Sequence, residues 1–426
     1  MLTIWGKEQG CCDGLPRREF LKVGGLGAGA LSLSLADILK LKAESATESR
    51  TASGGKSVIM IFLPGGPPHM DMYDMKPDAP VEYRGELRPI GTNVDGAQIS
   101  ELFPLQAGMM DKLSVLRSVV GMDGSHSGYQ FMTAYRKRDM RPALGSFVSK
   151  LEGSGSDMPP YVSLNRRNEE QAAYLGPQHG PFQPSGPALN NMRLPGGLKI
   201  DRFQARRGLL AAFDRMRRDV DASGKMEGMD GFSQRAFDMI SSGTVRQAFD
   251  IKQEDPGTVA AYGKGGQRFL MARRLVEAGV KVVTLSFGGW DTHSKNFVKM
   301  RKQLPELDQA LHALITDLEE RGLLDDVAIA MWGEFGRTPK VNKNAGRDHW
   351  PKVMSALFAG GGLRHGQVIG ATNPRGEYAI DGQVTEQNLH ATLYHVLGIN
   401  PEQTFINNAG RPTYILDERE VVRELV

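Results

Sequence analysis

The sequence predicts an α/β protein with a largely parallel central sheet. Short apolar runs rich in β-branched residues recur along the chain, glycines end them, and helical periodicities lie between them. The clearest run is Val280–Phe287, which stops at Gly288-Gly289. A run that is apolar on both faces is typical of a parallel strand covered on both sides.

Other segments repeat these patterns. Strands are predicted at Ser57–Leu63, Leu113–Val120, Tyr161–Leu164, Asp326–Trp332 and Ser355–Ala359. Helices are predicted at Glu101–Met110, from near Ser127 or Gly128 to Tyr135, and at Ala143–Glu152, Gln204–Asp221, Ser233–Ser241, Gly265–Ala278, Phe297–Arg321 and Thr385–Leu397. No internal repeat is present.

Residues 1–56 predict an export signal and a linker. Arg17-Arg18 precedes Glu19–Lys22 and a weakly apolar, Gly-rich stretch, Val23–Leu35, in a pattern that resembles a twin-arginine signal with Pro16 before the arginine pair. The stretch is too short and Gly-rich for a membrane span. The alternative is a basic helix start on a cytosolic protein. The twin-arginine interpretation predicts a periplasmic or extracellular protein, exported in folded form by the twin-arginine machinery, with no stable membrane span in its mature form.

Residues 57–426 are expected to form one domain, in which residues 153–265 are an insertion beside or over the sheet. Within it, Gly176–Gly197 is dense in proline and glycine, and a loop this long is expected to shape access to a site.

Composition narrows the functional classes. Lys and Arg total 52 against 49 acidic residues, a net charge of +3 that gives no argument for nucleic acid as a partner. Cys11 and Cys12 are the two cysteines and both lie in the leader, so the body can hold neither an internal disulfide nor a cysteine-based metal site. Any metal ligands in the body must therefore be histidines and carboxylates.

Such residues follow the apolar runs. His69 and Asp71 follow the run at Ser57–Leu63, and His126 and Ser127 follow the run at Leu113–Val120. Asp291 and His293 follow the run at Val280–Phe287, and Glu334 and Arg337 follow the run at Asp326–Trp332. A nearby loop adds Asp348 and His349. Ligands of open α/β sheets bind at the carboxyl ends of the strands. These groups are therefore expected to meet at one edge of the sheet.

Mixed histidine and carboxylate ligands predict one or two divalent ions: zinc, manganese, calcium or magnesium. Two ions could clamp the attacking and leaving oxygens in a displacement at phosphorus or sulfur. Ser127 is a candidate nucleophile, or alternatively only a helix N-cap. His126 is expected to point into the same cleft, and Arg337 to neutralise an oxyanion of the substrate. His179 is interpreted as an ordinary loop histidine and His312 as structural, and packing roles are favoured for His390 and His395.

Several segments together resemble a large bacterial family of uncharacterised exported proteins in the alkaline phosphatase–sulfatase superfamily. They are FLPGGPPHMDMYD, GSHSGYQFMTAYR, GGWDTHS, WGEFGRTPK, GRDHWP and HATLYHVLGI. The resemblance implies an alkaline-phosphatase-like three-layer α/β/α sandwich and a divalent-metal hydrolase of phosphate or sulfate esters. It also implies that Asp71, Asp291, His293, Glu334 and His349 stand at metal-ligand positions.

Two departures from that superfamily bear on function. Phe335 stands where the sulfatase pattern has a histidine, and no C/S-x-P-x-R motif is present, which argues against a formylglycine-dependent sulfatase. One hypothesis is a hydrolase of small-molecule or glycan esters. The other is a non-catalytic anion- or glycan-binding surface protein with a degenerate site. An oxidoreductase has little support, because no GxGxxG links a strand to a helix.

Overall fold

The computed structural model describes residues 55–153, 158–165, 169–184 and 243–426. The expected signal and most of the linker, the helices predicted at Gln204–Asp221 and Ser233–Ser241, and the Pro/Gly-rich loop beyond residue 184 lie outside the described residues. Among the helices that are described, none is both long and apolar enough to cross a membrane.

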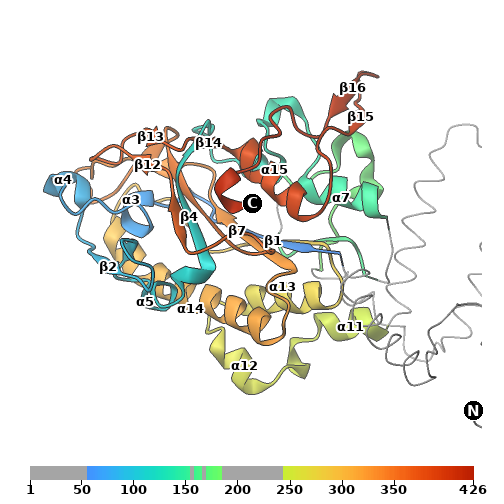
Figure 1. Cartoon of the computed structure of the whole chain (residues 1–426), viewed down its shortest axis with the longest axis horizontal. Coiled ribbons are helices and arrows are strands. Elements are labelled where there is room, and N and C mark those ends of the chain that lie inside the picture. The colour runs from blue at the N-terminus through green and yellow to red at the C-terminus, as the bar shows by residue number, and fades with distance from the viewer. Residues whose placement is uncertain (1–54, 154–157, 166–168, 185–242) are drawn as a thin grey trace, which may run out of the picture. The chain divides into compact units, whose positions relative to one another are not determined.

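Eight strands of the described chain form the central sheet (Figure 1). Their order is β11 (Gln367–Ile369), β4 (Leu113–Val120), β10 (Met354–Gly360), β7 (Val327–Trp332), β1 (Ser57–Phe62), β6 (Val282–Ser286) and β5 (Tyr161–Ser163), and β14 (Val384–Thr385) also pairs with β4. Pairing is parallel except at β10, which is antiparallel to both neighbours. The predicted α/β class with a largely parallel sheet is confirmed.

Strand β10 has a physical reason for its opposite direction. The chain leaves β7 at Trp332 and enters β10 at Met354, and the segment between them contains the short β8–β9 hairpin and no helix. A parallel return requires a crossover to the opposite end of the sheet, usually by a helix. The chain instead re-enters from the edge at which β7 ends.

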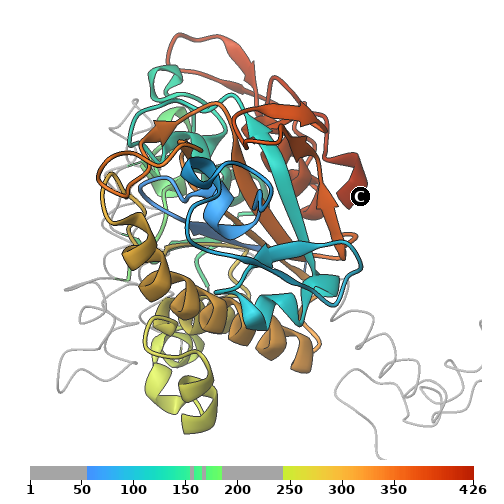
Figure 2. The same cartoon turned by 90° about the vertical axis from the view of Figure 1, so that its left-hand side faces the viewer.

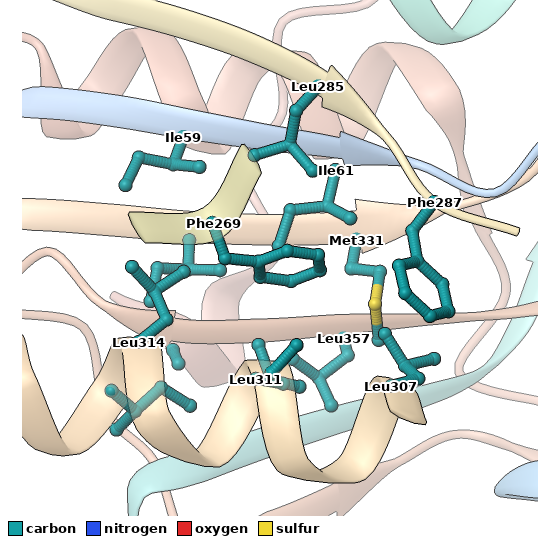
Figure 3. Packing of buried hydrophobic residues seen from close by; sticks show 14 of the residues in the cluster. Ile59, Ile61, Phe269, Leu285, Phe287, Leu307, Leu311, Leu314, Met331 and Leu357 are labelled. Carbon is teal, nitrogen blue, oxygen red and sulfur yellow. The ribbon is translucent and has the colours of Figure 1, made fainter. Parts of the chain in front are cut away.

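Helices cover both faces of the sheet, and alternate residues of β1 point to the two sides. Ile59 and Ile61 belong to one apolar cluster with α13 (Gln267–Glu277) and α14 (Asn296–Glu320), as Figure 3 shows. Val58, Met60 and Phe62 belong to a second cluster with α6 (Tyr129–Thr133), α7 (Leu144–Glu152) and α15 (Glu386–Val396). Figure 2 shows α14 running along one side of the sheet, with the C-terminal elements on the other. The predicted three-layer α/β/α arrangement is therefore present.

Smaller elements complete the described fold. Short hairpins are β2–β3 (Pro89–Gly91, Gln98–Ser100), β8–β9 (Gly336–Arg337, His349–Trp350), β12–β13 (Ala371–Thr372, Ala379–Asp381) and β15–β16 (Thr404–Ile406, Pro412–Tyr414). The remaining α-helices are α3 (His69–Met72), α4 (Val81–Arg84), α5 (Pro104–Ala107), α11 (Gly243–Phe249) and α12 (Pro256–Ala261). Single 3-10 turns lie at Met110–Lys112, Lys137–Asp139, Ala173–Leu175, Pro177–His179, Ile251–Gln253 and Arg423–Leu425.

Two predicted helices are shorter than expected. The segment predicted as Glu101–Met110 contains the short helix α5, which begins at Pro104 and ends at Ala107, with Gly108 as its C-cap. Proline fits the first turn of a helix, and glycine favours its end. Helix α6 stops at Thr133, because Ala134 adopts a left-handed conformation with φ 65°.

The leucine stripe of α14 is buried as its spacing predicted, and each such side chain contributes about 1.5–3 kcal/mol of burial free energy.

The region predicted as an insertion begins inside the sheet. Strand β5 pairs in parallel with β6 and forms an edge of the sheet. At the C-terminal end of the region, α11 and α12 precede α13. Arg273 of α13 forms buried ion pairs with Glu254, which lies within the region, and with Asp317 of α14. The described parts of residues 153–265 are thus joined to the main fold by strand pairing and ion pairs.

Candidate metal centre

The loop after β6 lies against the loop after β1. The Trp290 amide donates to the carbonyl of Pro64 at 2.8 Å, and the buried Trp290 ring donates to the carbonyl of Phe287 at 2.9 Å. A Cβ on Gly65, which has φ 105°, would come within 2.4 Å of the Asp291 nitrogen. Only glycine permits this close approach. The contact fixes where Asp291 leaves the strand end.

Four side chains converge at this edge: His126 from the loop after β4, Asp291 and His293 from the loop after β6, and His349 from β9. One ligand atom from each lies within 4.8 Å of the others. Asp291 Oδ1 is 3.1 Å from His293 Nε2, 3.6 Å from His126 Nε2 and 3.8 Å from His349 Nε2. The Nε2 atoms of His293 and His349 are 3.1 Å apart. These residues, called the tetrad below, are the candidate metal ligands.

Each tetrad histidine is anchored through its outer nitrogen. His126 Nδ1 contacts Glu334 at 2.9 Å, His293 Nδ1 contacts Asp348 at 2.6 Å, and His349 Nδ1 contacts the carbonyl of Gly124 at 3.1 Å. Since all three partners are acceptors, we assign the proton to Nδ1 in each ring. The Nε2 lone pairs then face one another and Asp291. Four electron-rich atoms this close together suit a bound cation. A hydrogen bond from the outer ring nitrogen to an acceptor is usual for metal-bound histidine.

Electrostatics favour the metal-binding protonation states of Asp291 and His349 and the charged state of the anchor Asp348. Burial raises the pKa of Asp291, but the hydrogen bond and charge of Arg337 outweigh it, so that the pKa is lowered overall. The hydrogen bond from His293 lowers the pKa of Asp348. Burial, followed by the charge of Arg337, lowers the pKa of His349. Near neutral pH the two carboxyl groups are therefore charged and His349 is neutral, as metal binding requires.

Glu334 lies behind His126 and outside the tetrad. Its carboxylate accepts the Gly65 amide at 2.8 and 3.0 Å and contacts His126, and the side chain is 4% exposed. The family resemblance implied that Glu334 stands at a metal-ligand position. In the structure it contacts Nδ1 of His126, a candidate ligand, and lies outside the tetrad.

Arg337 is fully buried, and protein groups occupy its guanidinium. It donates to the carbonyls of Gly66 and Arg347 at 3.0 Å each, to the carbonyl of Gly65, and to Asp291 Oδ1 at 2.6 Å. Four of its five N–H donors are used in these contacts, and the side chain has no exposed surface. In this structure Arg337 holds Asp291 and the loop after β1, and its contact with a substrate oxyanion stays a prediction.

Ser127 stands at the start of α6, outside the tetrad. Its hydroxyl accepts the Tyr129 amide at 3.3 Å, but the N-cap of α6 is Gly128, so the alternative N-cap role expected for Ser127 falls on the next residue. The neighbouring His126, expected to act in catalysis, is brought into the tetrad.

Asp71 and His69 are also outside the tetrad. Asp71 is fully buried and forms a two-bond ion pair with Arg347, at 2.8 and 2.9 Å, and accepts from Asn296 at 2.7 Å. Buried His69 contacts the carbonyl of Gly376 at 2.8 Å, and burial lowers its pKa. The roles of Arg347 and Asn296 were missed by sequence reasoning. The position of Arg347 directly before Asp348-His349 was the available signal.

Phe335 packs against the tetrad histidines. Its ring centroid is 4.5 Å from that of His349 and 5.2 Å from that of His126. It therefore closes one side of the centre with an apolar ring where the sulfatase pattern has a histidine.

Comparison with solved structures returned distant matches. The PsFucS1 sulfatase from Pseudoalteromonas sp. is 11% identical with a TM-score of 0.37, over 84% of this chain and 70% of that chain. The lipoteichoic acid synthase LtaP from Listeria monocytogenes is 11% identical with a TM-score of 0.32, over 82% and 73%. Ps i-CgsB in complex with k-i-k-neocarrahexaose is 10% identical with a TM-score of 0.38, over 81% and 72%. These values are too low to transfer any residue role or substrate.

Comparison of the sequence with protein families identifies the family of this chain. No curated protein matches it. Residues 55–426, which include the whole part expected to be the mature domain, match the family described as protein of unknown function (DUF1501). The chain therefore belongs to this family of unknown function.

Proposed function

We propose that the protein is an exported, divalent-metal-dependent hydrolase of phosphate or sulfate esters. The observation that carries the proposal is the tetrad with its outer anchors: three imidazole nitrogens and one carboxylate oxygen face a common point, and each imidazole is held from behind. The four residues stand at the edge where open α/β sheets bind ligands.

The donor set narrows the choice of ion. Three imidazoles and one carboxylate favour zinc or manganese over calcium and magnesium, which prefer oxygen ligands. A bound divalent ion would supply a Lewis acid for an ester oxygen in an in-line displacement. The protein holds the ligands in place, with Arg337 on Asp291, Glu334 on His126 and Asp348 on His293.

The tetrad is open to a substrate on one side. Asp291 and His293 have side chains about half exposed, at 51% and 48%, whereas Glu334 and Arg337 behind them are buried. Structural zinc centres usually have four protein ligands, whereas catalytic centres have three and an open position. The tetrad offers four candidate ligands, so its support for catalysis comes from the exposure of Asp291 and His293, which leaves room for a water or an ester oxygen as a fifth ligand.

A substrate panel tests the proposal. The full-length protein, reconstituted with zinc or manganese, is assayed on phosphate monoesters, phosphate diesters and sulfate esters, with Asp291→Ala beside it. We expect hydrolysis of at least one class and loss of both bound metal and activity in Asp291→Ala. Metal binding without turnover would favour the non-catalytic anion- or glycan-binding alternative, and failure to bind any divalent ion would overturn the proposed hydrolase.

The export part of the proposal rests on Arg17-Arg18 and is tested separately. Replacing both arginines with lysine should retain the protein in the cytoplasm, because the twin-arginine pathway reads the arginine pair. Cell fractionation and immunoblotting measure the distribution, with Arg50→Lys in the linker as control. An unchanged exported fraction in the double variant would argue against this route.

A further inference from the structure

Behind the tetrad lies a fully buried ion pair between Asp71 and Arg347, both with 0% side-chain exposure. All five N–H donors of Arg347 are used: two on Asp71, and the others on the carbonyls of Tyr83, Thr338 and Pro339. Because this guanidinium is saturated, its position is defined by five contacts from three separate segments.

The pair joins the two loops that carry three of the four tetrad residues. From Asp71, the bond to Asn296 reaches the first residue of α14, three residues after His293. The backbone N–H of Asn296 in turn donates to the carbonyl of Ala345 at 2.8 Å. Arg347 directly precedes Asp348 and His349, and its amide donates to the carbonyl of Thr292 at 2.9 Å. Asp71 thus contacts both loops without contacting the tetrad.

A second layer connects this pair to the ligands. The carbonyl of Arg347 accepts from Arg337, whose guanidinium also holds Asp291. The amide of Asp348 donates to Thr338 Oγ1 at 2.9 Å, and Asp348 holds His293. A displacement of Arg347 would therefore be passed to Asp291, His293 and His349 together.

We infer that Asp71 is a positioning residue of the metal centre, acting through Arg347 and Asn296 to set the spacing between the loops at residues 291–296 and 346–349. The inference rests on the proposed metal function and gives Asp71 a role other than metal ligand. A buried ion pair is often replaceable by apolar residues without loss of stability, so stability alone does not account for it. Keeping the two loops that carry candidate ligands at a fixed spacing accounts for the buried ion pair.

The test compares Asp71→Asn with Asp317→Asn. Asp317 also lies in a largely buried network, with Arg273 at 2.8 Å and Tyr262 at 2.9 Å, but it is near the other end of α14 and touches no tetrad residue. Both variants lose a carboxylate that an arginine neutralises and should unfold at lower temperature. Affinity for Co²⁺ or Zn²⁺ is measured by chelator competition on full-length protein, below the unfolding transition, together with the Co²⁺ absorption spectrum.

We expect Asp71→Asn to bind the ion about 10-fold more weakly, the lower end of the loss caused by removing a direct partner of a ligand, because Asp71 acts through Arg347 and Asn296. The Co²⁺ spectrum should shift as well. Asp317→Asn should match the wild type in both readouts. Asn296→Ala, which removes one bond and no charge, should shift affinity in the same direction and decides the question if Asp71→Asn does not fold.

Three results would overturn the inference. Unchanged affinity and spectrum in Asp71→Asn and Asn296→Ala would leave the ion pair a purely structural role. Loss of one of two bound ions in Asp71→Asn would make Asp71 a ligand. A wild-type protein that binds no ion would overturn the proposed function itself, and the positioning role with it.

Discussion

Replacing His293 with alanine is expected to weaken zinc binding more than any change outside the tetrad. His293 Nε2 is 3.1 Å from both Asp291 Oδ1 and His349 Nε2, so its removal deletes a ligand from the middle of the group. The loss should exceed the roughly 10–100-fold expected for losing an outer partner. Asp348→Asn, which keeps His293 but weakens its anchor, should fall within that smaller range.

Affinity is measured by competition with a chromogenic chelator, and ester hydrolysis is followed in parallel. His395→Ala is the control, because His395 is exposed on α15 and outside the tetrad. Zinc binding by His293→Ala at wild-type affinity would contradict the assignment of His293 as a ligand. A larger loss in Asp348→Asn than in His293→Ala would reverse the assigned roles.

Arg337→Met is expected to affect both stability and metal binding. The substitution leaves the buried carbonyls of Gly65, Gly66 and Arg347 without this donor and removes the positive charge that holds Asp291. Unpaired buried groups and the loss of a paired charge together should lower the free energy of unfolding by about 3 kcal/mol. Asp291, once released, should also hold zinc less firmly.

The matched control is Arg141→Met. Arg141 is similarly enclosed, donates to the carbonyl of Tyr414 at 2.8 Å and pairs with the half-exposed Asp417 at 3.3 Å, with no contact to the tetrad. Denaturant unfolding and zinc competition should show a stability loss in both variants and an affinity loss only in Arg337→Met. Wild-type affinity in a folded Arg337→Met protein would show that Asp291 does not depend on this arginine.

Apolar patterning predicted the strands and the leucine face of α14, because burial on both sides of a sheet leaves a direct record in the sequence. It did not predict the antiparallel direction of β10. A buried strand has the same apolar pattern in either direction, and its direction depends on whether the preceding segment forms a crossover. The short α5 and α6 depended on Pro104, Gly108 and the left-handed Ala134, where local backbone geometry overrides periodicity.

The strand-end rule identified His126, Asp291 and His293 as candidates at this edge, with His126 expected in catalysis, and the nearby loop at residues 346–351 added His349. The rule could not rank them by depth, since Asp71, Glu334 and Asp291 all follow buried strands. What separates them is the partner each one meets. Asp71 meets Arg347, 276 residues away, and Glu334 meets the Gly65 amide, 269 residues away. Contacts so distant in the chain leave no local pattern in a single sequence.

The central claim is that one divalent ion binds among His126, Asp291, His293 and His349. Anomalous X-ray diffraction at the zinc absorption edge, from crystals of zinc-loaded protein, tests it most directly. We expect an anomalous difference peak about 2.0–2.2 Å from each of four atoms, which is the usual range for zinc bonds to nitrogen and oxygen. The four atoms are His126 Nε2, Asp291 Oδ1, His293 Nε2 and His349 Nε2. No peak within the tetrad, or a peak bound instead by Asp71 or Glu334, would contradict it.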